Sequence, residues 1–424
     1  MNSTDITEVR AWEALDSRGR PTVGCRVTLH GGGFGRVVVP SGASTGGYEA
    51  QELRDGGTRY RGFGASSAVA NVNTLLADAV VGMSAEDQAS VDAMLAGLDE
   101  DHALGHVGSN AVLAVSLATL LAAADARRQP LWKMLGGLEP LLPMPMVNIF
   151  SGGAHAGRAI DLQDILAVPL GARTVAEAIE WVSRVRHQAD LALVAAGFAT
   201  NCVADEGGLA APLAANEDAL RLVTDAISAT GLHPGKDVWI AVDIAANQLW
   251  TDGQYTLKTE RLQLTTEEWL STLCEWCDRY PICSLEDVLH EDDWANWTAA
   301  TARLGEGRQL LGDDLFATNA ERLSQGVRSR AANAVLVKPN QAGTVTRTAD
   351  VVKIARAAGY ATVVSARSGD TEDSWLADLA IGWRAGQIKV GSTTRSERTA
   401  KWNRLLEIEA TEHDTHFATN ALRV

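Results

Sequence analysis

Apolar residues in the second half of the chain come in short runs, and each run ends at a charged residue. The runs VWIAVD, ICSLE and QLLGD end at Asp243, Glu286 and Asp313. Two later runs, AVLVK and GQIK, end at Lys338 and Lys389. If the runs are successive parallel strands, their charged ends meet at one rim of the sheet. The pattern therefore predicts a site in which three carboxylates face two ammonium groups.

The first part of the chain has a different pattern, which predicts a separate α+β domain. Residues 7–30 alternate apolar and polar around DSRGRPT, which predicts a hairpin, and the glycines of HGGGFGR predict a turn into the strand VVVP. From residue 65 to about residue 128 the apolar period is helical. We therefore expect an N-terminal α+β domain over residues 1–140.

Strand-like and helix-like runs alternate over residues 141–424, which predicts a βα-barrel as the second domain. Three prolines in GLEPLLPMPMVNIF indicate a linker before it. We expect strands at LQDILAV and FATNCVADEGG, and helices near 174–197 and 215–230, before the five runs described above. The count of about seven or eight strands fits a barrel better than an open sheet.

Size and charge narrow the possible partners. A chain of 424 residues with 46% hydrophobic and 21% charged residues is typical of a soluble protein with two domains. The net charge of −16 and the lack of a basic stretch argue against nucleic acid or an anionic membrane as a partner. The N-terminus has no signal-peptide pattern, and the longest apolar stretch, Ala111 to Ala124, is too short to span a bilayer. We expect a cytoplasmic protein.

The cysteines do not indicate a disulfide framework, because there are five of them in a long chain. Cys274 and Cys277 form a CxxC pair within TTEEWLSTLCEWCDRY, where this spacing is that of one helical face. A zinc site is the alternative, but a second pair of ligands is missing from the sequence. We favour packing on a helix.

The three strand-end acids favour a site for Mg²⁺ or Mn²⁺. Asp243, Glu286 and Asp313 offer hard oxygen ligands without histidine or thiolate, which selects these ions over zinc. The alternative is that each acid caps a helix. A lysine beside bound cations has a lowered pKa and can act as a base on a carbon acid, so Lys338 and Lys389 are candidates for that role. Surface lysines are the alternative.

Two further acids come from the units before the metal ligands. Asp164 lies in DLQDILAV and Glu206 in VADEGGLAAP, and paired carboxylates in different environments can divide acid and base roles. Taken without context, the sequence favours a helix cap or a surface charge for each of them. His155 lies in the glycine-rich segment SGGAHAG.

Two loops have the composition of substrate-binding segments. PSGASTGGYEA, residues 40–50, is dense in small residues and can fold over a phosphate or a metal as a mobile lid, or can simply be a flexible loop. SARSG follows the strand ATVV and places Arg367 and Ser368 where they can clamp a phosphoryl group.

Together these segments resemble the enolase family over nearly the whole chain. The resemblance is carried by DSRGRPT, VPSGASTGGYEA, GSNAVLAVSLA, SGGAHAG, VADEGG, SLEDVLHEDDW, GDDLFATN, LVKPNQAGT, SARSGDTEDSW and GQIKVGSTTRSERTAKWNRLLEIE. It implies an N-terminal capping domain on a C-terminal βα-barrel, a homodimer or larger assembly, and two Mg²⁺ ions. It also implies a small phosphorylated hydroxy acid, similar to 2-phosphoglycerate, as the substrate.

The resemblance implies a role for each candidate residue. Asp243, Glu286 and Asp313 would hold the first Mg²⁺, and Ser44 of the lid would help to bring the second to the phosphate. Lys338 would take the proton from C2, while Lys389 and the metals would hold the carboxylate. A lysine base with Mg²⁺ stabilising an enediolate is already a known pattern of enolase-superfamily sites.

The same resemblance assigns the leaving-group side. Glu206 would protonate the departing 3-hydroxyl, with two further catalytic residues beside it, Asp164 and His155. The residues that would bind the substrate and its phosphate are Gln163, Arg367 and Ser368.

The chain departs from the family at several positions. Enolases carry glutamate in place of Asp164 and histidine in place of Ala366. The smaller departures are Ser151 in place of Asn, Ala246-Asn247-Gln248 where the family has a Ser-Glu pair, and Val288 in place of Pro.

The two largest departures fall on the side where the hydroxyl leaves and the phosphate is bound. The leading hypothesis is a specialised enolase-like enzyme of phosphonate or phosphinate biosynthesis, such as a carboxyphosphonoenolpyruvate synthase. The alternatives are an ordinary glycolytic enolase and a catalytically weak scaffold or binding protein.

Overall fold

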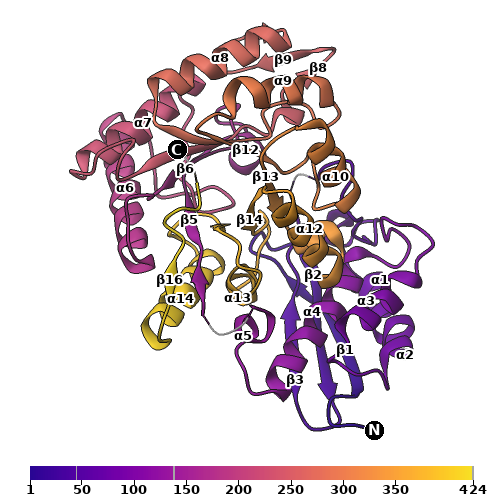
Figure 1. The fold of residues 1–424 in the computed structure, drawn as a ribbon. Helices are drawn as coiled ribbons and strands as arrows, with labels where there is room; N and C mark the ends of the chain where they lie inside the picture. The colour runs from indigo at the N-terminus through magenta and orange to yellow at the C-terminus, as the bar shows by residue number, and fades with distance from the viewer. Residues whose placement is uncertain (44, 137–138, 423–424) are drawn as a thin grey trace.

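The chain folds into two domains, and the computed structural model describes all residues except 44, 137–138 and 423–424. In Figure 1 the N-terminal domain, indigo to purple, lies below a larger α/β domain. Helix α12 (Val345–Ala357) of the larger domain meets it: Asp92 accepts hydrogen bonds from the backbone N and Oγ1 of Thr346, at 2.8 and 2.6 Å. The smaller domain thus satisfies donors at the start of this barrel helix.

An antiparallel sheet and helices make up the N-terminal domain. The sheet has the order β1-β2-β3, and the first two strands form the predicted hairpin. The Asp16 carboxylate accepts the backbone N–H groups of Arg18 and Arg20, and Gly19 has φ +70°, a left-handed conformation that glycine adopts without strain. The elements are β1 (Ile6–Leu15), β2 (Pro21–Leu29), β3 (Phe34–Val38), η1 (Arg59–Gly62), α1 (Ser66–Asn71), η2 (Val72–Leu76), α2 (Ala77–Val80), α3 (Gln88–Gly97), α4 (Ser109–Ala126) and α5 (Leu131–Gly136).

Helix α4 is the centre of this domain and corrects one expectation. It has 18 residues and is long and apolar enough to cross a membrane, whereas the apolar stretch alone indicated a shorter segment. It packs against β2 and β3, and 83% of it is buried in the protein. A helix that is apolar on all sides and buried in this way is typical of a domain core.

The larger domain is a closed barrel of eight strands, as predicted, but one strand runs against the others. β6 pairs antiparallel with both β5 and β7, and the remaining neighbours are parallel. In barrel order the strands are β5 (Met144–Ser151), β6 (Asp164–Val168), β7 (Trp239–Asp243), β11 (Ile282–Glu286), β12 (Gln309–Gly312), β13 (Ala334–Val337), β14 (Ala361–Ser365) and β15 (Gln387–Lys389).

Two predicted elements of this domain were wrong. GLEPLLPMPMVNIF contains most of barrel strand β5, all of whose residues are buried, and is therefore not a simple linker. FATNCVADEGG contains no strand and is a loop between α6 (Val175–Ala195) and α7 (Asn216–Ala229), two helices that confirm the predictions. The barrel still has eight strands, because β5 is a strand that the sequence did not predict and it replaces the one expected in FATNCVADEGG.

Helices surround the barrel, and two small sheets flank it. The CxxC pair lies on helix α8, as the spacing predicts, with Cys277 buried and Cys274 partly buried. The further elements are η3 (Gly153–Ala156), η4 (Ala246–Gln248), α8 (Thr266–Arg279), α9 (Trp294–Leu304), α10 (Ala320–Ser329), α11 (Pro339–Ala342), α13 (Trp375–Gly382), α14 (Ser396–Thr411), the sheet of β8 (Trp250–Thr251), β9 (Gln254–Leu257) and β10 (Leu262–Leu264), and the pair β4 (Leu141–Leu142) and β16 (His416–Phe417).

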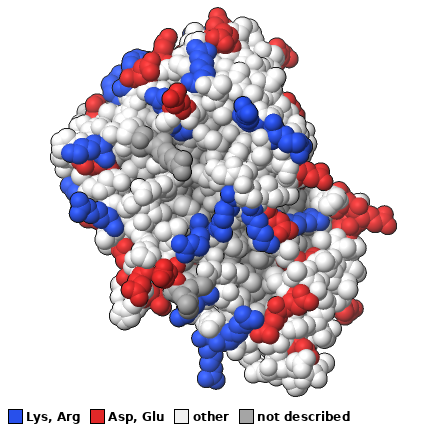
Figure 2. Space-filling model, viewed as in Figure 1, with Lys and Arg blue, Asp and Glu red and all other residues white. Residues whose placement is uncertain are grey.

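Charged side chains of both signs are scattered over the face shown in Figure 2. Basic side chains gather near the middle of this face, and acidic groups lie around them. The net charge of −16 is therefore not collected in a single patch on this side of the molecule.

Candidate active site

The charged strand ends meet at one rim of the barrel, as the sequence predicts. Asp243, Glu286 and Lys389 are the last residues of β7, β11 and β15. Asp313 and Lys338 directly follow β12 and β13. The barrel therefore gathers three carboxylates and two ammonium groups that lie far apart in the sequence.

The strand-end acids are not caps of the helices that follow them. The backbone N–H groups at the start of α8, α9 and α10 are accepted by Thr265, Asp293 and Asn319. The capping positions are thus filled by other side chains, and this result favours a functional role for the three acids.

Lys389 ties two of these acids together. Its Nζ lies 2.6 Å from Oδ2 of Asp243 and 2.9 and 2.8 Å from the two carboxylate oxygens of Glu286. All three side chains are buried. Although burial favours the neutral amine, the carboxylates of Asp243 and Glu286 hold the pKa of Lys389 well above its ordinary value. Burial and the charge of Asp243 raise the pKa of Glu286.

Lys338 contacts the third acid, Asp313, in a short ion pair. Burial lowers the pKa of Lys338, but Asp313 outweighs it and the pKa lies above the ordinary lysine value. This direction is opposite to the one expected for a base beside bound cations. The reason is that the carboxylate of Asp313 contacts this lysine and favours its charged form. A cation bound to Asp313 would weaken the ion pair and so lower the pKa of Lys338.

A second acid directly follows two of the predicted ligands, Asp287 after Glu286 and Asp314 after Asp313, and its surroundings differ from those of the ligand. Asp287 accepts the backbone N–H groups of Asp313 and Asp314, at 2.9 and 2.8 Å, and so holds the turn that carries the Asp313 carboxylate. Burial and the charges of Asp314 and Asp313 raise the pKa of Asp287 well above its ordinary value. Burial, Asp313 and Glu49 raise the pKa of Asp314 to about 8.

Asp164 reaches the same rim although it begins its strand. Because β6 is antiparallel, its first residue lies opposite the last residue of β7, with Asp164 in register with Asp243. Oδ2 of Asp164 lies 2.8 Å from Nδ1 of His155, and Oδ1 accepts from Ser151 at 2.8 Å and from Asn148. Asp164 is therefore held on both oxygens.

His155 is the charged partner of Asp164. Burial favours the neutral ring, but Asp164 and Glu206 raise the pKa of His155 to about 9. Burial raises the pKa of Glu206, but the charges of His155 and Arg398 outweigh it, so the Glu206 pKa is lowered. At neutral pH the proton of this group is thus on the imidazole, and Glu206 is ionised.

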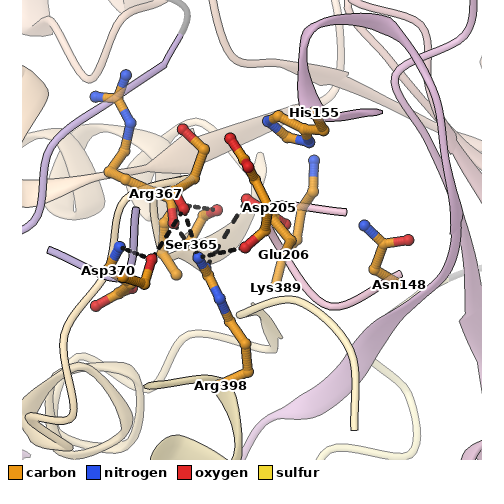
Figure 3. Close-up of polar contacts among 12 residues, drawn as sticks. Asn148, His155, Asp205, Glu206, Ser365, Arg367, Asp370, Lys389 and Arg398 are labelled. Atoms are coloured by element: carbon orange, nitrogen blue, oxygen red, sulfur yellow. Dashed lines mark hydrogen bonds and ion pairs between the residues drawn. The ribbon is translucent and has the colours of Figure 1, made fainter. Parts of the chain in front are cut away.

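Arg398, which the sequence did not single out, joins Glu206 to the segment with Arg367 and Ser368. Its guanidinium donates to the backbone oxygens of Arg367 and Ser368, at 2.7 Å each, and to that of Asp205 at 3.4 Å. It also lies 4.0 Å from Oε1 of Glu206 (Figure 3). Arg398 is fully buried, so this one side chain fixes two loops relative to each other.

The lid segment contributes Glu49 to the site. Both carboxylate oxygens of Glu49 contact the Arg367 guanidinium, at 2.7 and 3.2 Å, and Gln341 donates to Glu49 and to Asp313. The lid is thus connected to the predicted phosphate clamp and to a predicted metal ligand. Ser44, the predicted lid ligand, lies outside the described residues.

The rim encloses a cavity that brings most of the predicted residues together. Ala366, the position of the largest departure, is among its lining residues, and Asp164 is not. Asp164 instead lies behind His155, which does line the cavity. The lining residues are His155, Gln163, Glu206, Asp243, Lys338, Ser365, Ala366, Arg367, Ser368 and Lys389.

Comparison with known families matches both domains. The enolase N-terminal domain matches residues 6–135, and the C-terminal TIM barrel domain of enolase matches residues 139–422. The chain belongs to the enolase family. The protein is therefore an enolase-superfamily enzyme of the lyase type, with the capped barrel that the resemblance implies.

Enolases bind Mg²⁺, and the residues of this barrel rim fit that ion. Asp243, Glu286 and Asp313 offer carboxylate oxygens, the ligands that Mg²⁺ prefers. Within the described part of the chain, Oδ1 of Asp243 is buried without a hydrogen-bond partner. A buried carboxylate oxygen without a donor is costly unless a cation is available to it.

The enolase site also contains residues that the sequence analysis did not find. They are Asn148, Asp287, Gln341, Arg398 and, in the lid, Glu49. Asp287 directly follows the predicted ligand Glu286 in the sequence, and this pair of neighbouring acids was a usable signal. The contacts of Gln341 and Arg398 depend on the folded barrel, and local sequence gives no sign of them.

Proposed function

We propose that this enolase-family protein removes the C2 proton of a 2-phosphoglycerate-type acid and eliminates its 3-hydroxyl, and that the phosphorus end of its substrate is altered or bulkier than a phosphate. A specialised activity such as that of a carboxyphosphonoenolpyruvate synthase fits this description. The observation that carries the proposal is Ala366, a methyl group beside Arg367 in the wall of a cavity that Asp243, Lys338 and Lys389 also line.

The enolate-forming half has all the groups that its chemistry needs. Lys338 takes the C2 proton once its amine is neutral, and Lys389 is placed to hold the substrate carboxylate beside Asp243 and Glu286. When bound, Mg²⁺ neutralises the charge that develops on that carboxylate. A proton beside a carboxylate is only weakly acidic, so this charge stabilisation is the larger contribution to the rate.

The leaving-group half supplies the second proton. The C3–O bond breaks and the hydroxyl leaves as water, with a proton from the group formed by His155 and Glu206. The raised pKa of His155 favours a protonated ring at neutral pH, and the contact of Nδ1 with Asp164 orients that ring. One proton goes to Lys338 and one leaves His155, so the reaction is balanced.

The Ala366 methyl group changes what this half can bind. Neither a hydrogen-bond donor nor a ring is present at this position, so the wall beside Arg367 and Ser368 leaves more space for a substituent of the substrate than a histidine would. An ordinary phosphate would lack one donor there, and a missing donor in such a site usually costs about 10²- to 10³-fold in rate.

The test separates the two chemical steps with 2-phosphoglycerate and Mg²⁺. Exchange of the C2 hydrogen in deuterated water should be readily detected by NMR, whereas phosphoenolpyruvate, followed by ultraviolet absorbance, should form slowly. Turnover of about 10 per second or more, the median of ordinary enzymes, would instead identify a glycolytic enolase. A scaffold protein would show neither exchange nor product.

A further inference from the structure

The lid segment has one aromatic residue, and its ring lies on an arginine of the barrel. The guanidinium carbon of Arg322 is 3.6 Å from the centre of the Tyr48 ring. The hydroxyl of Tyr48 donates to Oδ1 of Asp292 at 2.8 Å. The backbone N–H of Gly47 also meets the barrel, at 3.3 Å from both carboxylate oxygens of Glu291. The lid segment is therefore attached to the barrel at a place outside the cavity.

Barrel groups hold Arg322 in position beneath this ring. Its Nε donates to the backbone oxygen of Leu315 at 2.7 Å, and its Nη2 donates to that of Glu291 at 2.6 Å. The guanidinium carbon is also 5.0 Å from the centre of the Trp294 ring, and the residue is only 8% exposed. None of these partners belongs to the lid segment. Arg322 is therefore a fixed cationic surface on which the lid segment can dock.

The next residue of the lid segment faces the opposite way. Tyr48 is 44% exposed, whereas Glu49 is buried with both carboxylate oxygens on the Arg367 guanidinium. The backbone N–H of Ala50 then donates to the backbone oxygen of Gln341 at 2.8 Å. Three consecutive residues thus join the outer surface of the barrel to the predicted phosphate clamp.

The composition of the lid segment explains why it needs such an attachment. It contains three glycines, and only Tyr48 and Glu49 have large side chains. A glycine-rich backbone has many conformations, and fixing it in one of them is costly in entropy. A cation over an aromatic ring is attracted to it, and more strongly when the cation is removed from water, as Arg322 is. Tyr48 alone in this segment can supply that contact.

We propose that Tyr48 is a positioning residue: by docking on Arg322 and Asp292 it fixes the lid segment so that Glu49 reaches Arg367. The docking involves only side chains of this chain. Its value for substrate binding rests on the proposed function, in which Arg367 holds the phosphorus end of the substrate.

Three variants separate docking from other effects of the ring. Tyr48→Leu removes the aromatic face and the hydroxyl, whereas Tyr48→Phe keeps the face and loses only the hydrogen bond to Asp292. Tyr60→Leu is the matched control. Tyr60 is 45% exposed and has the guanidinium carbon of Arg59 at 4.9 Å from its ring centre, but it lies outside the lid segment.

The measurement is amide hydrogen exchange of the full-length protein without substrate, followed by mass spectrometry of peptides from the lid segment. We expect these amides to exchange about tenfold faster in Tyr48→Leu than in the unchanged protein, because the segment opens more often. Tyr48→Phe should exchange more slowly than Tyr48→Leu, and Tyr60→Leu should match the unchanged protein. Peptides from barrel strand β13 should keep their exchange rates in every variant.

Three results would overturn the inference. Equal exchange of the lid segment in Tyr48→Leu and Tyr60→Leu would show that Tyr48 does not hold it. Equal acceleration in Tyr48→Phe and Tyr48→Leu would show that the ring does not dock on Arg322. Acceleration of β13 as large as that of the lid segment would assign Tyr48 to overall stability. The test contains no substrate, so a failure of the proposed dehydration leaves its outcome unaffected.

Discussion

The two halves of the cavity are built in different ways. The enolate-forming half comes from distant strand ends, where Lys389 and Lys338 pair with Asp243, Glu286 and Asp313. The leaving-group half comes largely from the single hairpin between β5 and β6, which carries His155 and Asp164, with the Glu206 loop against it. The three acids and two lysines of the first half match the enolase pattern, and the two largest substitutions, at Asp164 and Ala366, lie in the second. This contrast is the reason for our proposal that proton abstraction is retained while the substrate differs.

The largest test of the comparison is the replacement Lys338→Met. General-base catalysis contributes about 10²- to 10⁴-fold, so we expect C2 exchange to fall by about that factor. Lys353→Met is the control, because Lys353 is an exposed lysine paired with Asp350 on α12. NMR of the deuterated product measures the rate of C2 exchange in both variants. If C2 exchange in Lys338→Met proceeds at the unchanged rate, Lys338 is not the base that abstracts the proton.

The charge state of the leaving-group half is tested by the pH dependence of folding. The folded pKa of His155 is raised to about 9 from an ordinary value of 6.5. Its protonation therefore adds stability that is complete below pH 6.5 and is lost as the pH rises through about 9. The difference amounts to roughly 3 kcal/mol at most.

Urea unfolding of the unchanged protein and of His155→Gln measures this contribution. The difference in unfolding free energy between them should be largest at low pH and should shrink toward pH 9. His187→Gln, at an exposed position on helix α6, is the control for the loss of a histidine. A gap that is independent of pH would show that His155 is not charged.

The role of Ala366 is tested by restoring the family's ring. Ala366→His should raise the formation of phosphoenolpyruvate from 2-phosphoglycerate by about 10- to 100-fold, because it returns a donor beside Arg367. C2 exchange should not change. Ala366→Leu fills the same space without a donor and should not raise the rate. Equal effects of histidine and leucine would indicate that only the volume of the cavity matters.

The smallest expected effect comes from Arg398→Lys. Arg398 joins the two loops of the leaving-group half. A lysine cannot reach the backbone oxygens of Arg367, Ser368 and Asp205 together, so the anion clamp loosens. We expect KM for 2-phosphoglycerate to rise about tenfold, with a smaller change in kcat. Arg404→Lys, on the same helix but paired with Asp378, is the control. A loss confined to kcat would contradict the positioning role.

The sequence predicted the enolate-forming half well because each of its residues ends an apolar run. A strand end is a local signal, and the barrel places all such ends of parallel strands at one rim. The same rule could not place Asp164, which begins a strand and reaches the rim only because β6 is reversed. Strand direction depends on the partners of a strand, and a single sequence does not contain that information.

The errors in the fold have physical reasons as well. Prolines usually interrupt strands, so the segment with Pro145 was interpreted as a linker, yet Pro145 stands in register with Ile388 of β15. All eight positions of β5 are buried, and all but Asn148 and Ser151 are apolar, as is typical of a strand buried on both faces. The loop with Glu206 has strand-like composition, but contacts with Arg398 and Ser392 hold it without a ladder.

The reversal of β6 has a consequence for how this enzyme could diversify. In a parallel barrel the residues of one catalytic function are scattered over several crossovers. Here residues 148–164 form one continuous hairpin that carries Asn148, Ser151, His155 and Asp164 to the rim together. Much of the acid–base machinery for the leaving group therefore lies on one continuous segment, so a change within residues 148–164 alters this half and leaves the distant strand ends that make the enolate in place.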